Sequence, residues 1–465
     1  MHTRIKQISQ EWRSLTRLAI MVGVLGASAV LGAMASKWLV LLVVAAVGGV
    51  IVFTGLLRWM EVGLLFLIPI SFLLPWGIGT GTETEINLTI IWLILLLGVW
   101  IIKMVVSERR VTLRGSRVNL PSLVFIAVTF LAMLAGRMQW MVFTTEQASI
   151  FSQIGGVLML VLPVCLLLLT ANVIQDDKWI RGMVWIFLGL GVIYTLAMWI
   201  PGGGILTGRF NQKAVSAVFF IWSTALTGGM WLFNDSLKGW RRWGMGVLLA
   251  LTVGTGFWFM RTHASTWFSI LIVLGVLVWL KSWRIGLLLS LVVVVFGMWQ
   301  YDAIIERIFR VEEYSAITRA ATWPIMWELV KASPILGLGP SNYYFYTPLF
   351  SLMGYYIKFN SHNNYWDIAA QVGLVGLGVF VWLAATLGAT GIKLRRVVKQ
   401  GFSRGYVNGA IAGMAGTLAV GMLGDWFMPF VYNIGFDGFR GAVFAWLFLG
   451  GMLAYEQMLQ QGKDV

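Results

Sequence analysis

The sequence predicts an all-α integral membrane protein that crosses the bilayer many times. Of its 465 residues, 59% are hydrophobic and only 11% are charged, whereas about 25% of the residues of a soluble domain are charged. The mean hydropathy is +0.82, and the apolar residues gather into runs of the roughly 20 residues that a helix needs to span a bilayer. A single cysteine, Cys165, excludes a disulfide framework and a cysteine-based metal site. We therefore expect one membrane domain over residues 1–465.

Fourteen apolar segments are candidate membrane helices. The third and eleventh are short, and the first two are separated only by Ser36 and Lys37. A count of twelve with one re-entrant hairpin therefore remains open, and we predict 12 to 14 transmembrane helices. In chain order the candidates cover residues 18–36, 38–57, 62–77, 86–102, 120–136, 153–173, 182–200, 214–233, 243–260, 264–280, 285–299, 366–390, 405–424 and 441–455.

The charged residues predict how these segments are oriented. Residues 1–17 are basic and are taken as a cytoplasmic segment, after which successive loops alternate between the two sides. The inner side then receives 23 of the 34 Lys and Arg residues and 8 of the 19 Asp and Glu residues, so its net charge is 23 − 8 = +15. The outer side receives 34 − 23 = 11 basic and 19 − 8 = 11 acidic residues. This positive-inside pattern predicts cytoplasmic termini and one large extracytoplasmic loop over 300–365. The net positive charge of the chain is then explained by its orientation in the membrane and not by nucleic-acid binding.

Ionisable residues are nearly absent from the predicted spans. Only Asp367, at the start of the span over 366–390, is of the Asp, Glu, Lys, Arg or His type. Ion-coupled carriers place such residues at membrane depth, and a flippase for lipid pyrophosphates should line an inner cavity with basic ones. A polysaccharide flippase or another non-enzymatic carrier stays the alternative, but the placement of charge favours chemistry at a membrane surface.

Three outer arginines are candidates for binding a phosphate-containing headgroup. Arg209 follows a glycine-rich turn in PGGGILTGRFNQK, Arg261 opens the short loop MRTHAST, and Arg319 lies where apolar residues recur near helical spacing. The last segment predicts an amphipathic helix along the membrane interface, followed by a turn at GLGP. Each arginine alone is explained by contact with lipid phosphates. Together they suit a pyrophosphate, because guanidinium is permanently charged and bidentate.

His362 is the candidate general base. Asn360 or Ser361 can cap the helix that becomes the span over 366–390. His362 would then lie in the first turn of this helix, where the positive end of the helix dipole and nearby arginines keep the imidazole neutral. A neutral imidazole accepts a proton near pH 7. A solvated interfacial histidine is the competing interpretation, and it is the preferred one for the other two histidines, His2 and His263.

The sequence predicts neither a metal site nor a cofactor. Glu312 and Glu313 are adjacent, so their side chains diverge in a helix or a strand. The acidic residues at helical spacing, Asp302, Glu306 and Glu313, are interleaved with Arg307 and Arg310, which is typical of a solvated helix. A P-loop, a dinucleotide-binding glycine motif after a strand and a nucleophile elbow are all missing from the sequence.

Segment 361–376, SHNNYWDIAAQVGLVG, resembles the His-Asn-x-Tyr, then Glu-x-Gly-x-x-Gly signature of the O-antigen ligase and O-antigen polymerase superfamily. The upstream stretch TRAATWPIMWELVKASPILGLGPSNYY is similar to the Arg, Trp and Pro-x-x-Gly-x-Gly region of the same superfamily, and LTGRFNQK and FMRTHAS resemble its earlier arginine elements. About 80 residues match closely. Three departures stand out: Gln371 replaces the usual Glu, Trp366 replaces the usual Leu, and MRTHAS lacks the usual Ser and Gly around Arg261.

The resemblance implies a metal-independent, inverting glycosyl transfer on the outer face of the bacterial cytoplasmic membrane. The donor would be an undecaprenyl-pyrophosphate-linked oligosaccharide, and His362 would remove the proton of the acceptor hydroxyl. The implied binding residues for pyrophosphate and glycan are Arg209, Arg261, Arg319, Asn363 and Tyr365.

The acceptor divides the superfamily into polymerases, which use another lipid-linked glycan, ligases, which use lipid A core, and protein glycosyltransferases. We expect a polymerase or a ligase, since no added soluble domain for protein docking is visible in the sequence. Membrane lipid is an expected partner, and a chain-length regulator is a further one.

Overall fold

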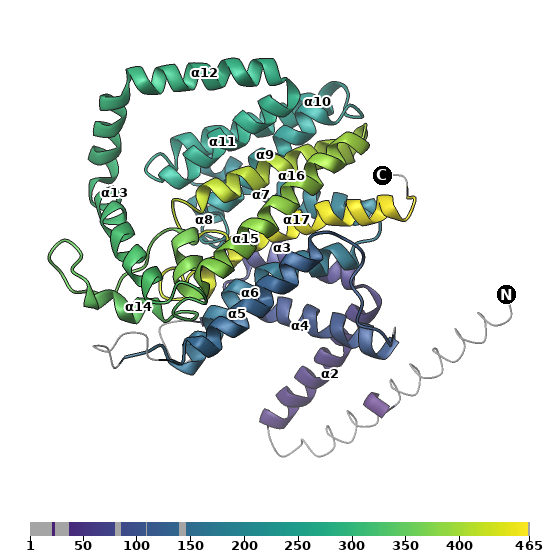
Figure 1. Ribbon diagram of the computed structural model, residues 1–465. Coiled ribbons are helices and arrows are strands. Elements are labelled where there is room, and N and C mark those ends of the chain that lie inside the picture. The colour runs from purple at the N-terminus through teal and green to yellow at the C-terminus, as the bar shows by residue number, and fades with distance from the viewer. Residues whose placement is uncertain (1–20, 24–36, 80–84, 108, 139–145, 464–465) are drawn as a thin grey trace.

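A computed structural model describes residues 21–23, 37–79, 85–107, 109–138 and 146–463 (Figure 1). The chain is α-helical, apart from a short antiparallel pair of strands, β1 (Gly77–Gly79) and β2 (Glu85–Asn87). The predicted cytoplasmic segment 1–17 lies outside the described residues, as does nearly all of the first predicted span.

The other thirteen predicted spans each coincide with a helix. These helices are α2 (Lys37–Arg58), α3 (Met60–Leu73), α4 (Leu88–Ile102), α5 (Asn119–Ala135), α6 (Ile150–Val173), α7 (Asp177–Trp199), α9 (Ala217–Phe233), α10 (Gly239–Trp258), α11 (Ala264–Lys281), α12 (Trp283–Trp299), α15 (Asn364–Val397), α16 (Gly401–Val420) and α17 (Phe439–Gln460). Hydropathy therefore located these thirteen apolar helices, whereas the helices α8 (Gly204–Thr207), α13 (Tyr301–Ala332) and α14 (Tyr343–Tyr346) lie outside the predicted spans.

Six of the described helical segments are long and apolar enough to cross a membrane. A seventh span results if α2 and α3, which meet at 117°, form one broken or re-entrant span. Three further apolar helices, α5, α9 and α12, are shorter. The protein is thus a multi-pass, all-α membrane protein, and the count of 12 to 14 spans stays a prediction.

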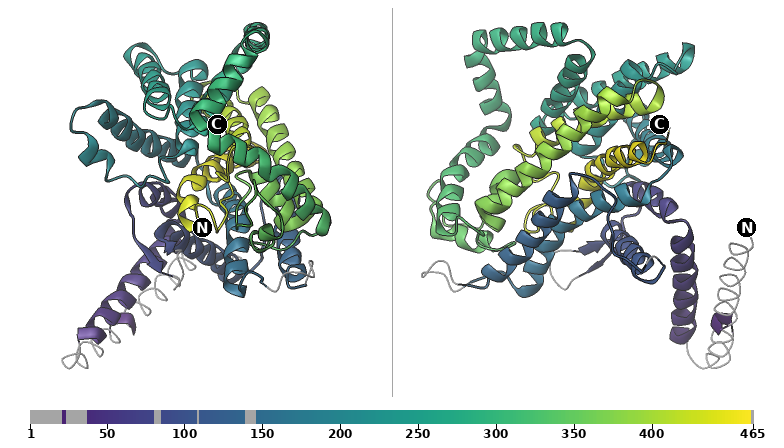
Figure 2. Two further views of the ribbon diagram at one scale, coloured as in Figure 1. Left: turned by 90° about the vertical axis from the view of Figure 1, so that its left-hand side faces the viewer. Right: turned by 45° about the vertical axis from the view of Figure 1, so that its right-hand side comes forward.

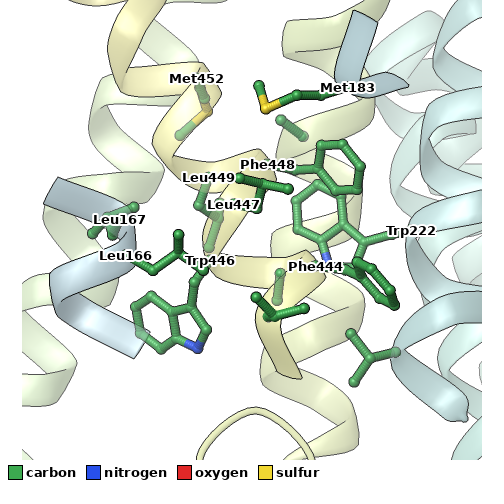
Figure 3. Close-up of a cluster of buried hydrophobic side chains, with 14 of the residues drawn as sticks. Leu166, Leu167, Met183, Trp222, Phe444, Trp446, Leu447, Phe448, Leu449 and Met452 are labelled. Atoms are coloured by element: carbon green, nitrogen blue, oxygen red, sulfur yellow. The ribbon is translucent and has the colours of Figure 1, made fainter. Parts of the chain in front are cut away.

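The core of the bundle surrounds α17, whose residues from Phe439 to Met458 are all buried. Figure 3 shows the apolar side chains of α17 between those of α6 on one side and those of α7 and α9 on the other. The aromatic rings of Phe72, Phe187, Phe219 and Phe444 pack together with centroids 4.7–5.7 Å apart. A helix that is apolar on all sides must be enclosed by other helices or by lipid, which explains the central place of α17.

Small residues bring α9 and α16 into close contact. A Cβ atom on Gly229 of α9 would lie 2.4 Å from the carbonyl oxygen of Gly405 in α16, and one on Gly409 would lie 2.7 Å from the carbonyl oxygen of Ala225. Glycine is required at such positions because it lets two helix backbones approach each other. The indole of Trp222 in α9 also donates a 3.1 Å hydrogen bond to Thr417 Oγ1 in α16.

An arched arm made of α12 and α13 (Tyr301–Ala332) leaves the bundle and returns to it (Figures 1 and 2). Most large apolar side chains of α12 are exposed, from Ile285 to Trp299, as expected where lipid covers a helix. The end of α13 packs against α15 through Ile325, Met326, Leu329 and Val330. The predicted helix around Arg319 is therefore confirmed, with Trp323 and Trp327 on its exposed side, and its position along the membrane interface stays a prediction.

Candidate active site

The candidate site forms where a tight turn lies against a break in α15. Gly373 inside α15 has a left-handed φ of 73°, and Gly337 in the predicted GLGP turn has a φ of 71°. The Leu338 amide donates a 2.8 Å hydrogen bond to the carbonyl of Ala370, and the Leu374 amide donates one of 2.8 Å to Pro334. The turn thus satisfies backbone groups that the break in α15 leaves without helical partners.

Gln371 joins the turn to α15 through both ends of its side-chain amide. Its Oε1 accepts a 2.9 Å hydrogen bond from the Ser341 amide, and its Nε2 donates one of 3.1 Å to the carbonyl of Asp367. A carboxylate at this position can accept the first bond but cannot donate the second. Gln371 is therefore a structural link that the family's usual Glu reproduces only in part.

His362 lies one residue before the cap of α15. The predicted cap at Asn360 or Ser361 is wrong: Asn363 is the cap, and its side chain accepts hydrogen bonds from the amides of Tyr365 and Trp366. The expected place of His362 in the first helical turn is wrong for the same reason. His362 instead has a left-handed φ of 47°, a conformation that few non-glycine residues adopt.

The imidazole of His362 is half-buried, and Arg319 is near enough for its charge to act on it. Burial lowers the pKa of His362 below its usual 6.5, and the positive charge of Arg319 lowers it further. The lowered pKa agrees with the expectation that the imidazole of His362 is neutral near pH 7. The causes are burial and one arginine from α13, which reaches the start of α15 because the end of α13 packs there.

Asn363 and Tyr365, the two implied binding residues next to His362, make hydrogen bonds within the protein. The Asn363 amide group also donates a 3.2 Å bond to the carbonyl of Met422. The Tyr365 hydroxyl donates a 2.6 Å bond to the carbonyl of Leu418 in α16. Both side chains hold the start of α15 against the end of α16 and the loop that follows it, and their role in binding substrate stays a prediction.

Behind His362, a buried polar network fixes the preceding residue. Ser361 Oγ lies 2.7 Å from Asp367 Oδ1, to which it donates, and the Tyr343 hydroxyl donates a 2.5 Å bond to the same oxygen. The Ser361 amide donates a longer bond of 3.4 Å to the Tyr343 hydroxyl. Burial and the carboxylate of Asp367 raise the pKa of Tyr343 well above 10, so this phenol keeps its proton and stays a donor.

Asp425, in the loop between α16 and α17, is a buried carboxyl that our sequence analysis did not single out. Its Oδ2 accepts a 2.8 Å bond from the Phe430 amide, and its Oδ1 accepts one of 2.6 Å from Asn433. Burial raises the pKa of Asp425. The sequence offered one signal, an isolated acidic residue in the apolar stretch GMLGDWFMPF. Tyr343 and Ser361 carried no comparable signal.

Arg209 and Arg261 are both exposed, each on a loop that follows a helix. Arg209 follows the short helix α8 (Gly204–Thr207), and Arg261 follows α10. The ends of α7 and α10, which precede these two loops, are in contact, because Trp199 packs against Phe259 with centroids 5.1 Å apart. Among the described residues, Arg319 is the arginine whose charge acts on His362, and no interaction joins Arg209 or Arg261 to that imidazole.

A cleft of about 620 Å³ lies next to the buried carboxyl of Asp425, because Asn433, which donates a hydrogen bond to Asp425, forms part of the cleft wall. The ring of Tyr344, the residue after Tyr343, stacks on Tyr432 with centroids 4.6 Å apart at one wall of the cleft. The other polar side chains in its wall are Glu85, Asn87, Ser152, Asn433, Asp437 and Arg440. Arg440 is 1% exposed and its Nε lies 2.6 Å from Asp437 Oδ1, so this ion pair fixes the floor of the cleft.

Metal-ligating side chains do not converge within the described part of the chain. No group of three His, Cys, Asp or Glu residues there is arranged to hold a metal ion. The side chains of Asp302, Glu306, Glu312 and Glu313 lie outside what the structure describes.

Comparison with known proteins gives one family match. Residues 245–381 match the model of the O-antigen ligase family, a range that includes Arg261, Arg319 and His362 and leaves out Arg209. No curated protein is similar enough to the chain to count as a match. This multi-pass membrane protein is therefore similar to the O-antigen ligase family over residues 245–381.

Proposed function

We propose that this protein transfers a saccharide from an undecaprenyl-pyrophosphate-linked donor to an acceptor hydroxyl, on the outer face of the cytoplasmic membrane. The observation that carries the proposal is a half-buried imidazole inside the matched domain, His362, whose pKa is lowered by burial and by the positive charge of Arg319. A neutral base beside a fixed cation suits a reaction in which one group loses a proton while another leaves as an anion.

The reaction proceeds in one displacement. The acceptor hydroxyl passes its proton to the free nitrogen of His362 as its oxygen forms a bond to the anomeric carbon of the donor. The bond between that carbon and the pyrophosphate breaks, and the pyrophosphate leaves with the electron pair, so the configuration at the carbon inverts. Arg319, with Arg209 and Arg261 from the loops after α8 and α10, neutralises the charge that develops on the pyrophosphate. His362 then gives its proton to solvent, and no step needs a metal ion.

The cleft beside Tyr344 is a suitable place for a saccharide. Carboxylates and amides of Glu85, Asn87 and Asn433 offer acceptors and donors for sugar hydroxyls, and the stacked pair of Tyr344 and Tyr432 offers flat apolar faces. Tyr343 belongs to the network behind His362 while Tyr344 lines the cleft. We therefore propose that the cleft binds the acceptor glycan.

A direct assay tests the proposal and distinguishes its variants. Purified protein is incubated with an undecaprenyl-pyrophosphate oligosaccharide, first alone and then with lipid A core. A ladder of products identifies a polymerase, which a chain-length regulator could then control, and a single addition to lipid A core identifies a ligase. His362→Ala is the matched control. Absence of any new glycosidic bond, together with movement of the intact donor across vesicle membranes, would identify the alternative, a flippase.

The proposed orientation places residues 300–365 outside the cell, both termini in the cytoplasm, and 12 to 14 spans between them. Its basis is the excess of basic residues, 23 against 11, in the loops assigned to the inner side.

A further inference from the structure

Two adjoining cavities lie at the end of the bundle opposite His362. The helix α15 is 34 residues long and connects the two regions, because it starts at Asn364, two residues after His362, and carries Arg395, which lines one of the cavities, near its other end. Their volumes are about 280 Å³ and 130 Å³, and both are lined by Phe233, Lys281 and Arg404. The ends of five helices, α9, α10, α11, α15 and α16, contribute to the walls.

Positive charge dominates this pair of cavities. Their lining contains four basic side chains and one acidic one, Asp235, so the net charge is 4 − 1 = +3; the basic residues are Arg242, Lys281, Arg395 and Arg404. Within the described part of the chain, none of the four lies within 4.0 Å of a carboxylate oxygen. The carboxylate of Asp235 instead accepts a 2.6 Å hydrogen bond from the Gly401 amide.

The basic groups are held in place by the protein. Arg395 Nε donates a 2.9 Å hydrogen bond to Oδ1 of the buried Asn408, and its Nη2 donates one of 2.5 Å to the carbonyl of Leu280. Lys281 Nζ donates a 2.8 Å bond to the carbonyl of Leu232. Arg404 Nη1 likewise donates a 2.9 Å bond to the carbonyl of Lys399. Four cations brought together from distant parts of the sequence, three of them fixed by such contacts, repel one another, so an anion that binds among them is stabilised.

We propose that these cavities bind the phosphate group of an anionic phospholipid. Guanidinium and ammonium groups are the usual partners of phosphate oxygens, and basic pockets between helix ends on the cytoplasmic side bind lipid headgroups. Near these basic residues, α10, α11 and α12 carry four exposed tryptophans: Trp240, Trp243, Trp279 and Trp283. A belt of tryptophans marks the membrane interface. This neighbourhood favours a lipid over soluble phosphate as the source of the anion.

The proposed lipid bridges the ends of helices that also pack against one another along their lengths, such as α9 and α16. It therefore stabilises the folded bundle by mass action, as does any ligand that binds only the folded state. The site is separate from the proposed donor site, because His362 and Arg395 lie at opposite ends of α15. The inference does not depend on the glycosyl-transfer reaction.

The test compares two double variants with equal loss of charge. Arg242→Gln with Arg404→Gln removes two cations from the cavities, whereas Lys393→Gln with Arg396→Gln removes two exposed cations of the same end of the bundle that line neither cavity. Binding to the purified full-length protein is measured by native mass spectrometry and by the shift in Tm. The probes are diphosphatidylglycerol, phosphatidylglycerol, zwitterionic phosphatidylethanolamine and inorganic phosphate.

The anionic lipids should bind to the wild type and to the control variant, and about thirty-fold more weakly to the cavity variant. This follows from about 1 kcal/mol per basic residue near a membrane surface and 1.4 kcal/mol per tenfold change in Kd. Equal weakening in both variants, or equal binding of phosphatidylethanolamine, would overturn the proposal. Saturable binding of inorganic phosphate with the same dependence on the cavity residues would keep the phosphate site and overturn the lipid as its source.

Discussion

Ser361 Oγ donates a 2.7 Å hydrogen bond to Asp367 Oδ1 and so ties the residue before His362 to the first turns of α15. On the other side of His362, the Asn363 cap fixes the start of the same helix. The left-handed backbone of His362 is thus held from both sides, as is usual for disfavoured conformations at functional sites. Asp367 and Tyr343 are positioning residues in this arrangement, since they act on His362 through Ser361.

Tyr343→Phe should lower both stability and rate. The variant removes one donor to Asp367 and the acceptor for the Ser361 amide, and a buried group left without its partner costs about 1–3 kcal/mol. We expect a lower Tm and a lower kcat for transfer, with the KM for the donor unchanged. Tyr355→Phe, at a tyrosine that is 70% exposed, is the control. A Tyr343→Phe protein with wild-type Tm and kcat would contradict the positioning role.

His362→Ala should reduce the rate by about 100-fold or more, the usual contribution of a general base, and should leave donor binding intact. In the wild type, the pKa of His362 is lowered by burial and by Arg319. The base is active when neutral, so kcat/KM should rise with pH, reach half of its maximum below pH 6.5 and then level off. A rate profile from pH 4.5 to 8, with and without EDTA, checks this. A midpoint above 6.5, or a loss of activity that only Mg²⁺ restores, would count against His362 as a metal-independent base.

The roles of the arginines can be separated by charge and by shape. Arg319→Lys keeps the charge that lowers the pKa of His362 but loses the bidentate contact, so the rate should fall more than about tenfold, or about 1.4 kcal/mol, with the pH midpoint unchanged. Arg319→Gln should also move the midpoint to higher pH, because the repelling charge is gone. Arg209→Ala should lower the rate without moving the midpoint. Normal rates in all three variants would leave these arginines as contacts to lipid.

Gly373→Ala should disrupt the break in α15. A Cβ atom on Gly373 would lie 2.0 Å from the carbonyl oxygen of Ile335, and its φ of 73° is already unfavourable for alanine. Strain of this kind costs about 1–3 kcal/mol before the clash is counted. The matched control is Gly378→Ala in the same helix, where a Cβ meets nothing within 4 Å; alanine there should be neutral or stabilising by up to about 1 kcal/mol. Equal Tm values for the two variants would show that the break is not required.

The orientation can be tested with two single cysteines in a Cys165→Ser background. Tyr356→Cys, in the proposed outer loop, replaces a side chain that is 69% exposed, and Lys399→Cys lies just after α15, at its other end. A membrane-impermeant maleimide should label position 356 in intact cells and position 399 only after permeabilisation. The reverse pattern would place His362 in the cytoplasm and remove the proposed reaction with an outer-face donor.

Hydropathy and charge were enough to predict the all-α membrane class, thirteen apolar helices and a helix around Arg319. These properties follow from local composition and spacing, because the bilayer requires long apolar helices whatever their neighbours are. The pairing of His362 with a cationic arginine was also predictable, since short motifs carried both residues.

The cap of α15 and the buried network around His362 were decided by the tertiary structure. Ser361, Asn363 and Asn364 are all competent to cap a helix, and sequence alone ranks them nearly equally. Contacts made by distant residues select among them: Asp367 and Tyr343 bind Ser361, while Asn364 donates a 2.6 Å bond to the carbonyl of Met428. Asn363 is left to cap the helix, and His362 is placed before it. A backbone carbonyl 64 residues away in the chain and a tyrosine 18 residues away carry no signal in the local pattern, so only the packed bundle determines which of these neighbours becomes the cap.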